Sequence, residues 1–108
     1  MPDKAPWRQE IELLQNYPKH KAFTFTTSSA NAEDAVVLAG SMEECNKVSL
    51  VVEQADAYIE FDGDAGTTTM YIPQDEGYFD DSIWFGTKIS VKRATNTNAR
   101  IRGILWGR

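Results

Sequence analysis

Apolar and polar residues alternate with a period of two over most of the chain after residue 21. This spacing places successive side chains on opposite faces of a β-strand. In the segments 47–53 and 56–62, apolar residues at every second position define one core face and one solvated face. The pattern predicts strands at 22–27, 47–53, 56–62, 87–93 and 99–106, and shorter strands at 35–39, 68–72 and 82–85.

About eight strands predict a mainly β, single-domain antiparallel β-sandwich or jelly-roll-like fold. Turn-forming residues separate the strands, at 28–31, 62–66, 73–77 and 95–98. The length of 108 residues fits one domain with one core. We expect an N-terminal arm or short helix over residues 1–20 and the β-sandwich domain over residues 21–108.

Helical spacing of any length occurs only near the N-terminus. Trp7, Ile11 and Leu14 lie at i, i+4 and i+7, and Pro6 suits a first helical turn. The dipeptide at 17–18, Tyr-Pro, ends the pattern. Such a helix either caps the core of its own domain or docks its apolar stripe on a neighbouring molecule.

The charges are segregated along the chain, whose net charge is −5. Residues 33–81 hold thirteen acidic residues and one basic residue, whereas residues 82–108 hold six basic residues and no acidic one. Two explanations stay open. Basic and acidic strands could pair within one sheet, or an acidic face of one copy could meet the basic face of the next in a cyclic assembly.

Residues with catalytic or metal-binding chemistry are few. His20 is the sole histidine and is expected to be a solvated loop residue, and Cys45 follows two glutamates that disfavour a thiolate. The acidic turn at 62–66 begins like a calcium loop, but Gly66 and Pro73 occupy positions that need oxygen ligands. We therefore expect no catalytic residue, no metal and no cofactor, and hence no enzyme.

Several aromatic residues lie in or beside predicted strands, namely Tyr71, Tyr78, Trp84 and Trp106. Exposed aromatic rings in a small β-sandwich can stack on sugar rings, so a glycan-binding module is the alternative from another class of function. Aromatic residues are at least as frequent in cores and subunit interfaces. Burial in a core or interface is the preferred interpretation.

The N-terminal residues 1–9 are polar and lack the apolar region of a secretory signal. No apolar run reaches the length that crosses a bilayer. The acidic balance disfavours nucleic acid as a partner. We expect synthesis in a cytoplasm and no membrane or nucleic-acid partner.

The second half of the chain carries a family resemblance. The runs DAYIEFDG at 56–63, MYIP at 70–73, GTKISV at 86–91 and ARIRGILWG at 99–107 resemble small accessory virion proteins of tailed bacteriophages. The resemblance covers residues 56–107 and implies a structural protein of the virion, made in the host cytoplasm. It implies capsid decoration or cementing first, and a place in the head-tail connector, collar or tail as the alternative.

The expected partners are virion structural proteins, such as the major capsid protein or neck proteins, and further copies of the chain in a homo-oligomer. Aromatic anchors and rim charges are the usual components of such contacts. The candidate interface residues are Trp7, Ile11, Leu14, Arg100, Arg102 and Trp106.

Overall fold

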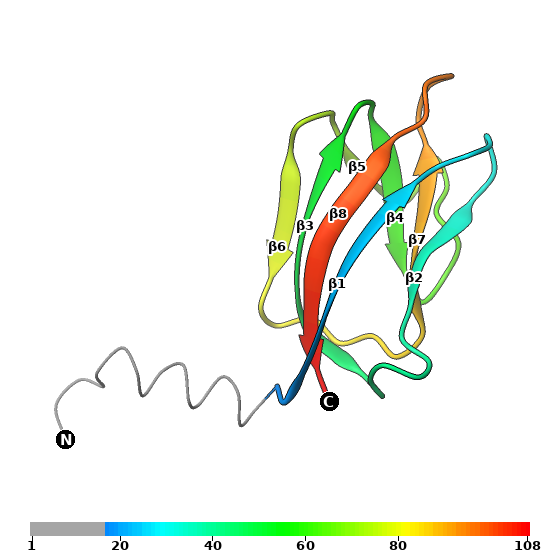
Figure 1. Ribbon diagram of the computed structural model, residues 1–108. Helices are drawn as coiled ribbons and strands as arrows, with labels where there is room; N and C mark the ends of the chain where they lie inside the picture. The colour runs from blue at the N-terminus through cyan, green and yellow to red at the C-terminus, as the bar shows by residue number, and fades with distance from the viewer. Residues whose placement is uncertain (1–16) are drawn as a thin grey trace, which may run out of the picture.

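The computed structural model describes residues 17–108, which form two four-stranded antiparallel sheets packed face to face (Figure 1). The β8 sheet has the strand order β1-β8-β3-β6, and the β7 sheet has the order β2-β7-β4-β5. None of the described residues lies in a helix, and the predicted β-sandwich is confirmed. The strands are β1 (Lys19–Thr26), β2 (Glu33–Val37), β3 (Cys45–Glu53), β4 (Ala57–Phe61), β5 (Met70–Ile72), β6 (Gly77–Asp80), β7 (Lys88–Arg93) and β8 (Arg100–Gly107).

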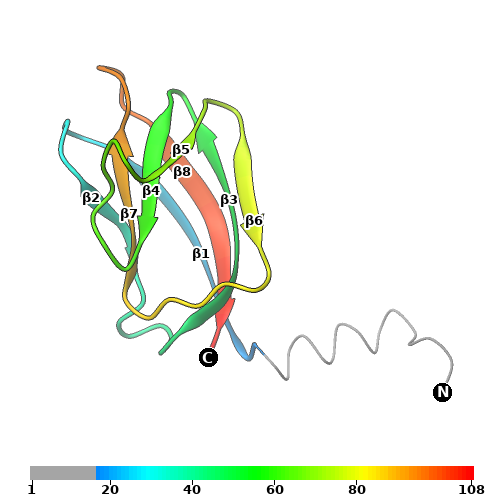
Figure 2. The ribbon, with the colours of Figure 1, turned by 180° about the vertical axis from the view of Figure 1, so that it is seen from behind.

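The strands pair as in a long antiparallel ribbon that has been rolled up. β1 pairs with β8, β2 with β7, β3 with β6, and β4 with β5. Rolling brings β8 beside β3 and β7 beside β4, which completes the two sheets. Figure 2 shows β7 between β2 and β4 from behind. This pairing is the jelly-roll topology.

The core lies between the sheets and follows the alternation seen in the sequence. In β3, Val48 and Val52 are completely buried, and in β4 Ala57 and Ile59 are buried as well. Burying one such aliphatic side chain contributes about 1.5–3 kcal/mol. The other large members of the core are Phe23, Val36, Leu38, Met42, Leu50, Ile72, Phe85, Ile89, Val91, Ile101 and Leu105.

One predicted strand is wrong. The segment 82–85 is a loop in which only Phe85 makes an isolated bridge, to Cys45. The strand that the sequence pattern did not predict is β6, which follows the turn predicted at 73–77 and pairs with β3. Phe85 is buried in the core, and its ring centroid lies 4.9 Å from that of Phe61. A buried loop residue thus gave the sequence the apolar spacing of a strand where none forms.

The N-terminal boundary also differs in detail, because β1 begins at Lys19 and includes His20. Residues 17 and 18 are in neither helix nor strand, and the rest of the arm or helix expected over residues 1–20 falls on residues 1–16, which lie outside the described part of the chain.

The β4–β5 loop, residues 62–69, is tied to β7. The Asp62 carboxylate accepts hydrogen bonds from the backbone N–H groups of residues 86–88, at 2.6 to 3.2 Å. Farther along the loop, the Ala65 N–H donates to the Ser90 hydroxyl oxygen at 2.9 Å, and Ser90 is completely buried. The acidic turn is therefore part of the framework rather than a freely solvated connection.

Candidate functional site

The outer face of the β8 sheet, which points away from the β7 sheet, carries cationic, acidic and aromatic side chains side by side. Its side chains are those that alternate with the buried residues of β1, β8, β3 and β6. Strand register arranges them in rows. The rows are His20, Trp106 and Lys47; Ala22, Ile104, Ser49 and Phe79; Thr24, Arg102 and Val51; and Thr26, Arg100 and Glu53.

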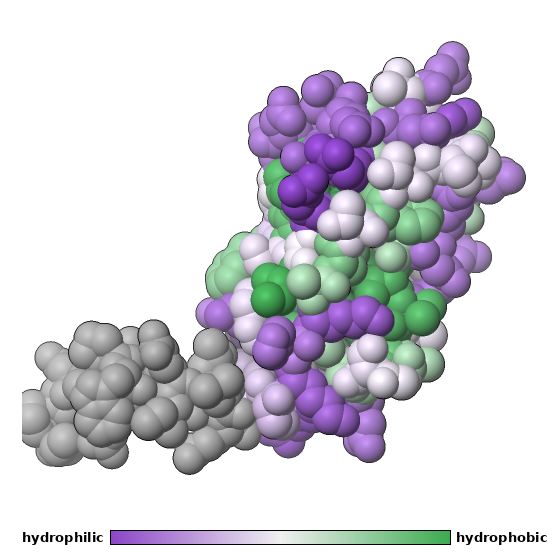
Figure 3. All heavy atoms as spheres, viewed as in Figure 1, coloured by the Kyte–Doolittle hydropathy of each residue, from purple (hydrophilic) through white to green (hydrophobic). Residues whose placement is uncertain are grey.

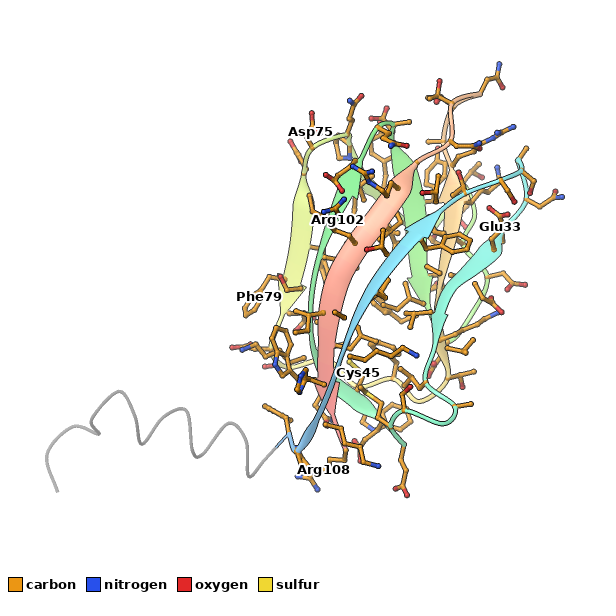
Figure 4. All side chains as sticks on the ribbon, in the orientation of Figure 1. Glu33, Cys45, Asp75, Phe79, Arg102 and Arg108 are labelled. Carbon is orange, nitrogen blue, oxygen red and sulfur yellow. The ribbon has the colours of Figure 1, made fainter. Side chains whose placement is uncertain are left out.

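A cation lies between two aromatic rings at one end of this face. The Lys47 Nζ atom is 4.7 Å from the ring centroid of Trp106 and 5.5 Å from that of Phe79. These distances allow cation–π attraction to both rings. Phe79 is 59% exposed and projects away from β6 (Figure 4). We call Lys47, Phe79 and Trp106 the Lys47 cluster.

Ion pairs occupy the other end of the face. Glu53 Oε1 accepts a hydrogen bond from Arg100 Nε at 3.1 Å, and Arg102 Nε forms a salt bridge with the same oxygen at 2.8 Å. The hydrogen bond from Arg100 is the main reason why the pKa of Glu53 lies below its usual value. The Arg102 side chain is 51% exposed and is available to a second anionic group (Figure 4).

The structure brings together three of the six predicted interface residues. Arg100, Arg102 and Trp106 all lie on the outer face of β8, at alternate positions. Trp7, Ile11 and Leu14 fall outside the described residues. Sequence reasoning missed Lys47 and Phe79, because no strand was predicted at β6 and the neighbour of Lys47 could not be identified.

The segregated charges meet within the chain at several points. Besides the pairs of Glu53, Lys88 Nζ lies 2.8 Å from Asp34 and 2.9 Å from Asp64. The basic strands β7 and β8 are inner strands of their sheets: β7 lies between β2 and β4, both from the acidic part of the sequence, and β8 has β3 from that part on one side and β1 on the other. Of the two explanations for the charge pattern, pairing within one sheet is therefore the one with contacts in the structure.

Burial in the core of the domain does not explain all four of the aromatic residues that were expected in a core or interface. Trp84 is 65% exposed and Tyr71 is 49% exposed, so neither belongs to the core, and an interface role for them stays a prediction. Tyr78 and Trp106 are partly buried. Tyr71 lies on β5 with its ring centroid 5.6 Å from that of Tyr58, and its hydroxyl donates to Asp56 at 2.7 Å.

His20 and Cys45 differ in their exposure to solvent. His20 is exposed on β1, opposite Trp106, and so belongs to a strand and not to the predicted loop. Cys45 is fully buried at the start of β3. Burial raises the pKa of its thiol to about 11. Burial, and not the preceding glutamates, is thus the main cause of the low acidity.

Cys45 is expected to resist thiol reagents in the native protein. At pH 8, a pKa of about 11 leaves roughly one thiol in a thousand ionised, and the reagent cannot reach a buried sulfur. Ellman's reagent should label the chain slowly in buffer and rapidly in guanidinium chloride. Complete labelling of the native protein within minutes would show that the Cys45 pocket opens readily.

No group of three or more histidine, cysteine or acidic side chains within residues 17–108 is arranged to hold a metal ion. The same residues form no detectable pocket. They also contain no helix with the length and hydropathy needed to span a bilayer.

Comparisons with known proteins yield no match to a protein-family model, to a curated protein or to a solved structure.

Proposed function

We propose that this chain is a structural virion protein of a tailed bacteriophage that decorates the capsid by binding other virion subunits. The observation that carries the proposal is the outer face of the β8 sheet, where Lys47 is held between Phe79 and Trp106. An exposed aromatic ring beside fixed cations is typical of residues that dominate protein–protein binding energy. Jelly rolls are frequent in viral capsids, which supports the proposal by fold analogy alone.

The chemistry of the face defines the partner surface that would fit it. Lys47 and the exposed Arg102 favour acidic side chains, and Phe79 favours an apolar recess. The net charge of −5 disfavours contact with packaged DNA and suits the outside of a capsid. Placement at the head-tail connector, collar or tail uses the same face on a different partner.

The test is binding of the purified chain to phage capsids assembled without it, measured by cosedimentation. Phe79→Ser and Lys47→Glu should each weaken binding at least tenfold, because each removes a contact of the Lys47 cluster. Trp84→Ser is the matched control, since Trp84 is equally exposed but lies on the β6–β7 loop. It should bind like the unmodified chain.

Two results would overturn this assignment. Absence of binding to capsids, necks and tails would reject a virion role. Weakened binding in Trp84→Ser with normal binding in Phe79→Ser would place the contact elsewhere on the domain.

Glycan binding is a second candidate because Tyr71 is exposed and held in place by Asp56 and Tyr58. A fixed aromatic ring can stack on a sugar, and a carboxylate beside it can accept hydrogen bonds from the hydroxyl groups of the sugar. Glycan-array binding that Tyr71→Ala abolishes, and Phe79→Ser preserves, would favour this function over decoration.

A further inference from the structure

The four edge strands of the sandwich differ in how they are protected against pairing with another chain. Edge strands expose unpaired backbone groups, and proteins block them with charges, prolines, bulges or short length. β6 has four residues, ends at Asp80 and is followed by Asp81, and β5 has three residues and is followed directly by Pro73. β2 begins with two acidic residues and contains a register shift after Asp34. These three edges are all blocked.

β1 lacks these features over most of its length. It has eight residues and pairs with β8 without a register shift. No charged residue and no proline occurs from residue 22 to residue 32. Lys19 and Lys21 lie in its first half, and the Lys21 ammonium group is engaged by the Ser41 hydroxyl at 3.0 Å. Within residues 17–108, β1 is thus the sheet edge best suited to accept another strand.

The hydrogen-bonding groups on this edge can be identified from the pairing with β8. The Thr27 N–H donates to the Ala99 carbonyl oxygen, so Thr27 points its backbone toward β8. Backbone groups alternate in direction along an antiparallel strand. Residues 20, 22, 24 and 26 therefore direct their N–H and C=O groups toward the free edge, and their side chains are exposed.

Hydrophobic residues border the same edge. Val37 on β2 is 45% exposed, and Phe25 and Ala35 are only partly buried. Figure 3 shows hydrophobic residues on the side of the sandwich between β1 and β2. A strand added to β1 would cover part of this apolar surface, which would add to the backbone hydrogen bonds.

We propose that β1 pairs antiparallel with β1 of a second copy, which joins the two β8 sheets into one continuous eight-stranded sheet across a two-fold axis. In the register centred on Phe23, Ala22 faces Thr24 of the second copy and His20 faces Thr26. Each of these residues directs its backbone toward the edge, so the register uses all the groups identified above. Such an isologous contact closes on itself as a dimer.

The distribution of charge along β1 supports a second copy as the occupant. Antiparallel pairing places the basic first half of one β1 against the uncharged second half of the other, so that no like charges meet. Lys19 then approaches the far end of the other β1. At that end the Glu33 carboxylate accepts hydrogen bonds from the backbone N–H and the hydroxyl group of Ser28.

The test is the mass of the complete 108-residue chain by analytical ultracentrifugation, from micromolar to millimolar concentration. The unmodified chain should form a dimer. Thr24→Pro should raise the dissociation constant at least tenfold, because it removes an N–H that points to the free edge and leaves the bonds to β8 intact. A monomer at every concentration, or a mass above that of a dimer, would overturn the proposal.

A second variant covers the case in which proline disturbs folding. Thr24→Lys with Thr26→Lys places like charges on both sides of the two-fold axis and should also yield a monomer. Thr67→Lys with Thr68→Lys adds the same charge to exposed positions of the β4–β5 loop and should remain dimeric. If both double variants raised the dissociation constant of the dimer equally, the effect would come from net charge alone, which would overturn the proposal.

Hydrogen exchange identifies what covers the edge. The amides of residues 22, 24 and 26 should be protected only at concentrations at which the dimer forms, and Thr24→Lys with Thr26→Lys should remove that protection. Protection that persists in a monomer would mean that residues 1–16 of the same chain cover β1, which would overturn pairing with a second copy.

Discussion

Replacing Gly103 by alanine is expected to lower the free energy of unfolding by about 3 kcal/mol. Gly103 lies on β8 where β3 approaches closely. An added Cβ would overlap the Ser49 carbonyl oxygen and lie 2.9 Å from the Cα and Cβ atoms of Leu50. These atoms belong to the backbone or adjoin it, so the two strands must move apart. Chemical denaturation followed by tryptophan fluorescence measures the loss.

The matched control is Gly66→Ala in the β4–β5 loop, where an added Cβ meets no atom within 4 Å. This variant should stay within about 0.5 kcal/mol of the unmodified chain. Equal stability of Gly103→Ala and Gly66→Ala would mean that β8 and β3 are less closely packed than the structure shows.

Alternation in the sequence was sufficient to predict most of the strands, because one face of each central strand is apolar and the opposite face is polar. β3 and β4 carry apolar residues at every second position, and these residues form the core. The same pattern could not distinguish a buried loop residue from a strand residue. Ile83 and Phe85 are spaced as they would be in a strand, but Phe85 is a loop residue that is buried in the core beside Phe61.

The candidate binding face was predicted only in part, because it depends on which strands become neighbours. Alternation placed Arg100, Arg102 and Trp106 on one face of the last strand. The position of Lys47 beside Trp106 depends on the register between β3 and β8. Phe79 joins them through the pairing of β6 with β3. These pairings are not encoded by local sequence patterns.

The acidic turn at 62–66 shows the same limit. Asp62 and the glycines around it predict a turn, and the structure contains one. The backbone N–H groups that Asp62 binds lie 24 to 26 residues later in the chain. Because these partners are distant in the sequence, Asp62 cannot be distinguished there from an acidic residue that only contacts solvent.

Replacing Asp62 by alanine is expected to lower the free energy of unfolding by about 2 kcal/mol. The carboxylate connects the end of β4 to residues 86–88, at the entry to β7. The backbone of Asp62 is also left-handed, with φ of 62°, which alanine adopts less readily than aspartate. Water can reach the exposed amides and limits the loss.

Two further substitutions separate the contributions at this position. Asp62→Gly removes the carboxylate but relieves the left-handed backbone, so it should be less destabilising than Asp62→Ala. Asp62→Asn keeps an acceptor for the N–H groups of residues 87 and 88, which share Oδ1, and loses the contact of Oδ2 with residue 86. It should be the mildest change. Equal stability of all three variants would show that the carboxylate does not hold this turn.

The dependence of stability on pH provides an independent test of the Asp62 carboxylate. Partial burial raises the pKa of Asp62, but the backbone N–H groups of residues 86–88 lower it more, so the pKa lies below its usual value. The folded state therefore binds this proton less readily than the unfolded state does. Its stabilisation is complete above the unfolded pKa of about 3.9 and is lost as pH falls through the lower folded pKa. Acid denaturation of Asp62→Asn should accordingly be less steep in this range, and identical acid profiles would contradict the assigned role.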